Sequence, residues 1–111
     1  MNAPADPIPG FAVIYRWRLK PGMEAQFVAA WTRITELYVA ERGGLGSRLH
    51  KGPDDIWFAY AQWSSAEARA AAFAGPSLDS EARARMSEAI AESFDEIVLE
   101  PVVDRLVPIA S

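Results

Sequence analysis

The chain contains no cysteine, a single histidine and no apolar run long enough to cross a membrane. Without cysteine no disulfide can form, which fits a reducing compartment, and we therefore expect a cytoplasmic protein. A transmembrane helix needs about 20 consecutive apolar residues, so we expect no membrane partner. One histidine, with no acidic cluster at ligand spacing, cannot supply the usual ligands of a metal site. Phosphate-binding loops, dinucleotide fingerprints, nucleophile elbows and cysteine–histidine pairs are also absent.

Basic charge is in short supply as well. The 111 residues carry a formal net charge of −4, which argues against nucleic acid as a partner. Half of the residues are apolar, so the chain can bury a core, and its length fits one domain. Residues 1–10 contain three prolines and no continuous apolar stretch, and we expect them to form a flexible tail before a domain at 11–107.

The stretch Ile56–Trp63 carries no charge and is dense in aromatic residues, which is typical of a strand covered on both faces. Successive side chains of a strand point to opposite faces. The alanines of one face leave room for a helix to lie close, whereas the other face becomes more polar towards its end, as a cavity wall would. The first face holds Trp57, Ala59, Ala61 and Trp63, and the second holds Ile56, Phe58, Tyr60 and Gln62.

Phe11–Lys20 alternates in the same way and predicts another strand. One face of this strand is apolar, and the other carries Arg16 and Arg18 beside Ile14. This second face suits a polar cavity or an exposed surface. A proline–glycine pair then turns the chain. The apolar face consists of Phe11, Val13, Tyr15, Trp17 and Leu19.

Met23–Arg42 has apolar residues at steps of three and four, which predicts a long helix packed on the sheet. Phe27 and Trp31 lie in the middle of this stripe, so we expect both in the core. A glycine pair ends the helix. A short strand at 45–51 and the turn after it then form an antiparallel hairpin with the aromatic stretch.

The second half of the chain predicts two helices and a strand. A capping box and a glycine–proline pair mark the bounds of the first helix. Proline cannot donate to a strand ladder, so the final strand starts late or lies at an edge. The expected elements are a helix at 65–73 capped by Ser64 and Glu67, a helix from Asp79 or Ser80 to about Phe94, and a strand at 97–107 interrupted by Pro101.

The resulting order, β-α-β-β-α-β, predicts an α+β fold of the ferredoxin-like type, with one antiparallel sheet and helices on one face. Right-handed crossovers place the first and third strands in the centre. The helix-free face still carries Phe58 and Tyr60. Exposing them would leave a sizeable apolar patch, so we expect a homodimer that buries this face.

Several motifs resemble those of the antibiotic biosynthesis monooxygenase family. These are Lys20-Pro21-Gly22 at the end of a strand, Glu24 and Phe27 in the helix after it, and Tyr60-Ala61-Gln62-Trp63 before a helix that contains Ala68. The resemblance covers about residues 11–107 and implies a dimeric α+β barrel. Some members of the family oxygenate polyketide-like aromatic compounds without metal or flavin, some degrade haem, and some isomerise small signalling molecules.

Two positions differ from the common family pattern. Many relatives have a glutamate where this chain has Ala61, and a histidine near Ala72. The haem-degrading members use an asparagine, a tryptophan and a histidine. This chain has its only asparagine at Asn2, so we expect no haem degradation by that route.

His50 is the candidate general base, because histidine is the side chain that titrates near neutral pH. Tyr60 and Arg16 complete the candidate catalytic set, and guanidinium groups suit an oxyanion. The alternatives are an exposed His50 beside Lys51, a Tyr60 in the core, and arginines paired with Glu100 or Asp104. The candidate substrate-binding residues are Arg18, Arg48, Phe58 and Gln62.

Two functions remain open from the sequence. One is a cofactor-independent monooxygenase that acts on a small aromatic or polyketide-like substrate, needing no metal, haem or flavin. The other is a non-catalytic dimeric domain of the same fold that binds a small apolar molecule or is purely structural. A defined cavity beside Arg16, His50 and Tyr60 would favour the enzyme.

Overall fold

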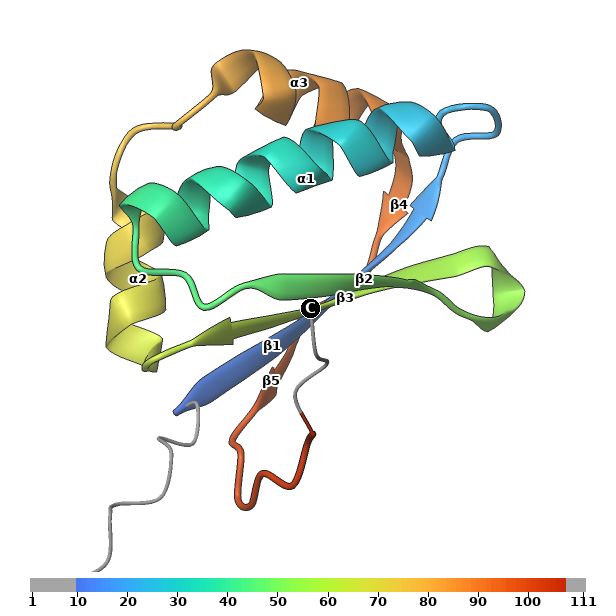
Figure 1. The fold of residues 1–111 in the computed structure, drawn as a ribbon. Coiled ribbons are helices and arrows are strands. Elements are labelled where there is room, and N and C mark those ends of the chain that lie inside the picture. The colour runs from blue at the N-terminus through green and yellow to red at the C-terminus, as the bar shows by residue number, and fades with distance from the viewer. Residues whose placement is uncertain (1–9, 108–111) are drawn as a thin grey trace, which may run out of the picture.

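A computed structural model describes residues 10–107, so the predicted tail lies outside the described residues except for Gly10 (Figure 1). The helices all lie on one side of a single sheet, and α1 runs across it. The elements are β1 (Phe11–Leu19), α1 (Glu24–Glu41), β2 (Ser47–Lys51), the 3-10 turn η1 (Pro53–Asp55), β3 (Ile56–Trp63), α2 (Ala66–Ala74), α3 (Ser80–Ala89), β4 (Ile90–Ser93) and β5 (Ile97–Leu99).

The sheet is antiparallel and has the strand order β2-β3-β1-β4, with β5 also paired to β1. β1 and β3 therefore lie in the centre, as the crossover rule predicts, and the ferredoxin-like fold is confirmed. Tyr15 stands opposite Ala59 and Arg16 opposite Phe58. This register separates the two faces that the alternating pattern predicts.

The core lies between α1 and the central strands. Phe27 is fully buried, and its ring centroid lies 5.1 Å from that of Trp17 and 6.3 Å from that of Trp57, both edge to face. Ala59 is also fully buried, and its small side chain lets α1 lie close to the sheet. Phe27 is in the core as predicted, whereas Trp31 is half-buried and packs at the border of the core.

The predicted helix up to Phe94 is wrong at its C-terminal end. α3 ends at Ala89, and the next four residues form β4 along β1. The backbone N–H of Lys20 donates to the carbonyl of Ala89 at 2.8 Å, and that of Phe94 donates to Arg16 at 3.0 Å. The free edge of β1 offers these partners, and such tertiary pairing overrides a helical pattern.

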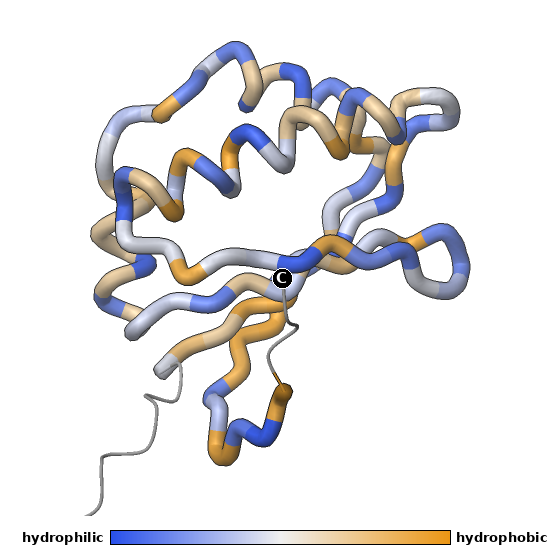
Figure 2. The backbone as a smooth tube through the Cα atoms, viewed as in Figure 1, coloured by the Kyte–Doolittle hydropathy of each residue, from blue (hydrophilic) through white to orange (hydrophobic). Residues whose placement is uncertain are grey.

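The last predicted strand is too long. β5 comprises only Ile97–Leu99, and residues 100–107 form no strand. Pro101 has no N–H to donate, which explains why the pairing with β1 stops before it. In Figure 2, residues 97–107 alternate between strongly hydrophobic and hydrophilic stretches. Seven of the eleven exposed large apolar residues lie in residues 97–107, with Val102 and Val107 each 85% exposed.

The helix caps agree only in part with the sequence. Ser65, and not Ser64, caps α2, because its hydroxyl accepts the N–H of Ala68 at 3.0 Å. Asp79 caps α3 by accepting the N–H of Ala82 at 3.0 Å, so α3 begins at Ser80, one of the two predicted starts. Within residues 10–107, no helix has the length and apolar character that crossing a bilayer requires.

Candidate functional site

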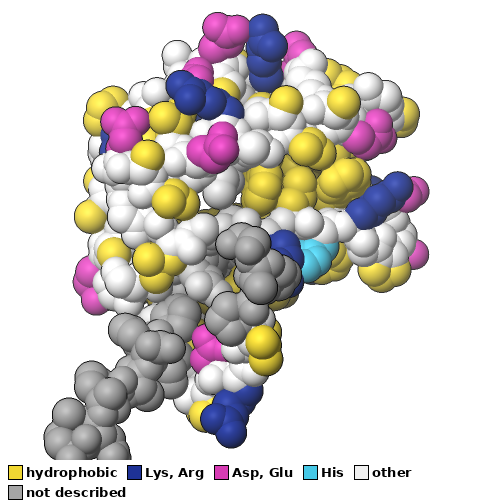
Figure 3. Space-filling view, viewed as in Figure 1, with side chains coloured by type: hydrophobic (Ala, Val, Ile, Leu, Met, Phe, Trp, Pro, Cys, Tyr) yellow, Lys and Arg dark blue, Asp and Glu magenta, His cyan; other side chains and the backbone are white. Residues whose placement is uncertain are grey.

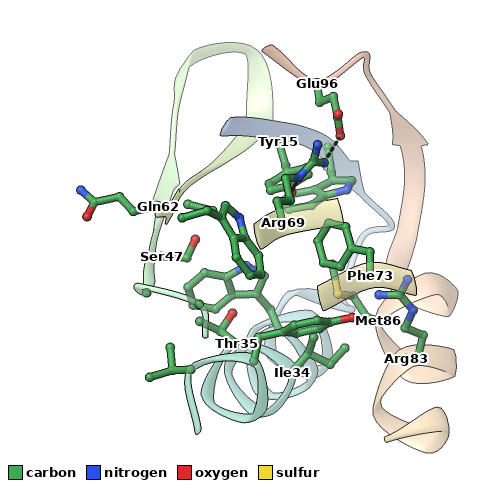
Figure 4. Close-up of a pocket in the computed structure, with 18 residues that line it drawn as sticks. Tyr15, Ile34, Thr35, Ser47, Gln62, Arg69, Phe73, Arg83, Met86 and Glu96 are labelled. Atoms are coloured by element: carbon green, nitrogen blue, oxygen red, sulfur yellow. Dashed lines mark hydrogen bonds and ion pairs between the residues drawn. The ribbon is translucent and has the colours of Figure 1, made fainter. Parts of the chain in front are cut away.

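A cavity of about 390 Å³ lies between the helices and the sheet (Figure 4). Its volume is in the range of small-molecule sites. The walls come from β1, β2, β3 and all three helices, together with Glu96 from the connection between β4 and β5. The largest apolar side chains of the lining are Trp17, Trp31, Ile34, Tyr38, Trp63, Phe73 and Met86.

Three aromatic rings form one end of this wall. Tyr38, Trp63 and Phe73 meet edge to face in all three pairs, with centroid separations between 5.2 and 6.0 Å. They come from α1, β3 and α2, so packing among three elements fixes their positions. Such a rigid aromatic wall suits a flat, apolar ligand.

The polar part of the cavity is a chain of three side chains, Tyr15, Arg69 and Glu96. Nε of Arg69 donates to the hydroxyl of Tyr15 at 3.1 Å, and Nη2 donates to Oε2 of Glu96 at 2.7 Å. The guanidinium also lies over two rings, 5.5 Å from the centroid of Tyr15 and 5.1 Å from that of Phe73. Figure 4 shows Arg69 between Tyr15 and Glu96. These contacts fix the plane of the guanidinium.

Local sequence explains how these groups meet. Tyr15 belongs to the face of β1 that carries Trp17, so its ring points to the helix side. Ser65 fixes the start of α2, and Arg69 follows one turn later, with its backbone N–H bonded to the carbonyl of Ser65 at 3.1 Å. Glu96 follows β4 and reaches Arg69 from the other side.

Burial and charge set the protonation of this chain. Burial raises the pKa of the Tyr15 phenol above its ordinary value of about 10, and the Arg69 guanidinium only partly offsets this effect. Burial alone would lower the pKa of Arg69, but its hydrogen bonds to Glu96 and Tyr15 outweigh burial and raise that pKa. At neutral pH the site therefore presents a neutral phenol and a permanent cation.

Two buried polar atoms of residues that line the cavity have no hydrogen-bond partner within residues 10–107. They are Nε1 of Trp63 and Oγ of Ser47. Trp63 is only 4% exposed, and an indole N–H that is buried without an acceptor costs stability. A third such atom, Nε of Arg16, belongs to a residue outside this lining.

By strand register, the seven candidate site residues of the sequence analysis belong to the opposite, helix-free face of the sheet, and only Gln62 among them also lines the helix-side cavity. A second, more open hollow of about 730 Å³ lies there, and Figure 3 shows the single histidine at the surface. His50 is exposed, as its alternative reading had it. The hollow brings together five of the seven, namely Arg48, His50, Phe58, Tyr60 and Gln62.

Arg16 and Arg18 do not line this hollow, although Arg16 stands opposite Phe58 in the sheet, and both contact residues after α3. Nη2 of Arg16 donates to the backbone carbonyl of Asp95 at 2.9 Å, and Arg18 forms an ion pair with Glu92 at 3.0 Å. Both guanidinium groups lie over the ring of Phe94, at 5.6 and 5.4 Å from its centroid. The predicted ion pairs with Glu100 or Asp104 are not formed, because β4 occupies this edge of β1. No group of three or more potential metal ligands occurs in the described part of the chain.

The family of this chain follows from its match to a known sequence profile. The sequence profile of the antibiotic biosynthesis monooxygenase family matches residues 10–89. The chain belongs to this family. By sequence, it matches no protein among those that have been curated.

Several solved structures share the fold of this chain. A proposed antibiotic biosynthesis monooxygenase from Chloroflexus aurantiacus J-10-fl has a TM-score of 0.68 and 22% identity, covering 88% of this chain and 98% of its own. Rv0793 from Mycobacterium tuberculosis has a TM-score of 0.68 and 21% identity, covering 86% and 98%. SnoaB, a cofactor-independent oxygenase from Streptomyces nogalater, has a TM-score of 0.70 and 14% identity, covering 86% and 95%. At these identities the likeness shows the fold.

Sequence reasoning missed the polar chain of this family member. The alternating pattern places Tyr15 on the apolar face of its strand. Its hydroxyl on that face is the feature that could have indicated a site there. Arg69 is the only charged residue between Ala68 and Ala74, so it interrupts an otherwise apolar helix. Glu96 offered no signal, because it follows a strand that the sequence pattern assigns to a helix.

Proposed function

We propose that the protein is a cofactor-independent monooxygenase that oxidises a small aromatic substrate in the cavity between helices and sheet. The observation that carries this proposal is the Tyr15–Arg69–Glu96 chain at the wall of an otherwise aromatic cavity. Family membership and the fold shared with SnoaB, a cofactor-independent oxygenase, support the reaction class.

The reaction needs electrons from the substrate itself. A substrate anion transfers an electron to O₂, and recombination of the two radicals forms a C–O bond. Protonation gives a hydroperoxide, and loss of water leaves a carbonyl, so one oxygen atom enters the product and the other leaves as water. The donors of Tyr15 and Arg69 stabilise the substrate anion and the developing peroxide charge, while the aromatic walls exclude water.

A non-catalytic ligand-binding role is the second candidate, and one observation favours it. Among the described residues that line the cavity there is no histidine, and its one carboxylate, Glu96, is already paired with Arg69. The cavity is therefore better equipped to hold an anion than to create one.

We also propose a homodimer in which a second copy covers the helix-free face. Phe58 and Tyr60 lie on this face, and the exposed apolar segment 97–107 begins with the edge strand β5. Burial of this surface should exceed about 1,200 Å², the lower end for stable interfaces. A catalytic site at His50, Tyr60 and Arg16 remains a prediction. In the proposed dimer these residues would lie in the interface.

The experiment is oxygen uptake with a panel of polyhydroxylated aromatic compounds, for the wild type and for variants of both faces. Tyr15→Phe and Arg69→Met should abolish most turnover, and activity should survive dialysis against a chelator. Turnover that is lost in His50→Ala or Arg16→Ala but kept in Tyr15→Phe would move the site to the helix-free face. Turnover only after addition of flavin, haem or iron would refute the cofactor-free reaction.

A further inference from the structure

The hollow on the helix-free face is a separate candidate for a ligand site, and strand pairing explains how its side chains meet. Arg48 stands opposite Tyr60, which stands opposite Ile14 on the other side of β3. His50 stands opposite Phe58 in the next row of the same face. Two neighbouring rows of the sheet therefore each carry a basic side chain on β2 and an aromatic ring on β3.

The polar groups of this hollow lack partners within residues 10–107. Arg48, His50 and Tyr60 take part in no side-chain hydrogen bond or ion pair there. Of the described residues that line the hollow, none is an aspartate or a glutamate. Although the whole chain has a net charge of −4, this surface is therefore positive.

The carboxylates of the C-terminal segment do not neutralise this charge. Leu106 lines the hollow, and the nearby Asp104 uses its Oδ1 to accept the backbone N–H of Leu106 at 2.9 Å. Within the described part of the chain, neither Asp104 nor Glu100 forms an ion pair with a basic residue. The charge of Arg48 is thus open to an anion from outside the chain.

The rest of the hollow is apolar and large enough for a small molecule. Ile14 and Phe58 come from the sheet, and Leu45 and Leu106 complete the lining from outside the regular strands. The volume of about 730 Å³ lies in the range of small-molecule sites. The hollow thus combines a cation with apolar walls, which suits an anion that has an apolar body.

The basic side chain of the hollow favours a carboxylate. The planar fork of a guanidinium matches the two oxygens of a carboxylate, so Arg48 can bind it with two parallel hydrogen bonds. His50 and Tyr60 offer one further N–H and one O–H donor on the same face. An apolar ring or chain attached to the carboxylate would pack on Phe58 and Ile14.

The proposed homodimer makes such an anion necessary. A second copy on the helix-free face would remove water from Arg48, and a charge that is buried without a partner is strongly destabilising. A carboxylate ion in the hollow would balance this charge. It would also fill space that two hollowed faces leave between them.

We propose that the helix-free hollow binds a small carboxylate ion with an apolar body, held by Arg48, and that this ligand strengthens self-association. The ligand is an effector that binds away from the substrate cavity, so the inference does not depend on the oxygenase reaction. Binding of the carboxylate stands without the dimer, and only its effect on self-association rests on the proposed dimer.

The test of binding uses isothermal titration calorimetry with three probes. Benzoate has both the charge and the ring, inorganic phosphate has only the charge, and benzyl alcohol has only the ring. The wild type and Arg69→Met are titrated, because Arg69→Met removes a cation of the helix-side cavity and isolates binding at the hollow. In Arg69→Met, benzoate should bind about tenfold more tightly than either other probe, since it alone uses both parts of the hollow.

Substitutions of Arg48 then locate the site. In the Arg69→Met background, Arg48→Met should abolish benzoate binding, and Arg48→Lys should keep part of it because the charge remains. Arg85→Met is the matched control and should bind benzoate normally, since this arginine is paired with Glu81 on α3 and does not line the hollow. Circular dichroism checks that each variant is folded.

Sedimentation velocity tests the effect on self-association. Saturating benzoate should lower the dissociation constant of the wild-type dimer about tenfold relative to chloride at equal ionic strength, as expected when one buried charge gains a partner. Arg48→Met should show no such shift, because it has no charge to balance.

Four results would overturn the inference. They are no benzoate binding in Arg69→Met, equal binding of benzoate and benzyl alcohol, benzoate binding that survives Arg48→Met, and a dimer whose dissociation constant benzoate leaves unchanged. The last result, with a weaker dimer in Arg48→Met, would mean that a carboxylate of the second copy pairs with Arg48. A monomer that binds benzoate through Arg48 would confirm the site and refute its effect on self-association.

Discussion

Nε of Arg69 lies 3.1 Å from the hydroxyl of Tyr15, although 54 positions separate the two residues along the chain. The same guanidinium holds Glu96 at 2.7 Å with a different nitrogen. One planar group thus connects α2, β1 and the β4–β5 connection. A lysine could not replace it without loss, because an ammonium cannot present two donors in a fixed plane.

Tyr15→Phe should lower kcat/KM for oxygen uptake about 100-fold, because it removes one donor from the proposed oxyanion site. The free energy of unfolding should fall by only about 1 kcal/mol, since one partly buried hydrogen bond is lost. Steady-state kinetics and urea denaturation measure the two effects. Loss of activity and of stability in proportion would instead indicate a structural role for the hydroxyl.

The raised pKa of Tyr15 gives a stability effect at high pH. Its folded-state pKa lies above the unfolded value of about 10, so the folded protein holds the proton more tightly. The contribution is fully present below the unfolded pKa and is lost as pH rises through the folded one. Wild type should therefore lose more stability than Tyr15→Phe between pH of about 9 and 11. Denaturation curves of both proteins at these two values test this, and parallel losses would contradict it.

Arg42→Met should destabilise the connection after α2. Nη1 of Arg42 donates to the carbonyl of Ala72 at 2.6 Å, and Nη2 donates to that of Pro76 at 2.9 Å. Removal of both donors should cost about 1–3 kcal/mol in urea denaturation. Arg85→Met is the control, because its exposed ion pair contributes little. Equal stability of the two variants would show that the carbonyls find other donors.

The variants Phe27→Ala and Trp31→Ala distinguish the role of a core residue from that of a residue in the cavity wall. Phe27 is fully buried, so its truncation should cost about 3–5 kcal/mol. Trp31 is half-buried and lines the cavity, and we expect a smaller loss of stability but a clear loss of ligand binding. Denaturant melts measure the loss of stability, and the KM for oxygen uptake with the panel of polyhydroxylated aromatic compounds reports the loss of ligand binding. A larger loss of stability in Trp31→Ala than in Phe27→Ala would contradict the assignment.

Leu106→Asp should weaken self-association. Leu106 is 75% exposed and lines the hollow on the helix-free face, so a charge there would have to be desolvated in the proposed dimer. Analytical ultracentrifugation should show a dimer for the wild type and more monomer for the variant. A folded wild-type monomer at micromolar concentration would refute the dimer.

The sequence predicts the sheet well, for a physical reason. Alternation along β1 and β3 has a period of two, so a shift of one residue in their register would put Trp17 and Ala59 on opposite faces. The spacing of Ile90 and Phe94 is less informative, because the residues between Ala89 and Phe94 can equally pair with a free strand edge. Tertiary pairing decided that segment, and local pattern could not.

The position of the cavity is harder to predict from the sequence. Strand parity tells which residues share a face, but not which face encloses a space. Arg69 and Glu96 are 27 positions apart, and their contact depends on β4 being a strand. Side chains from α2 and from the β4–β5 connection therefore could not be combined with Tyr15 before the topology was known.

Glu96 is the residue directly before β5, whose exposed apolar continuation would meet a second copy of the chain. Its ion pair with Arg69 links that segment to the wall of the cavity. Any ligand that draws Arg69 away from Glu96 would also change the free energy of self-association. Thermodynamic reciprocity then requires that dimer formation change the affinity for the ligand by the same factor. In the proposed dimer, ligand affinity should accordingly depend on protein concentration, with a midpoint at the dissociation constant of the dimer.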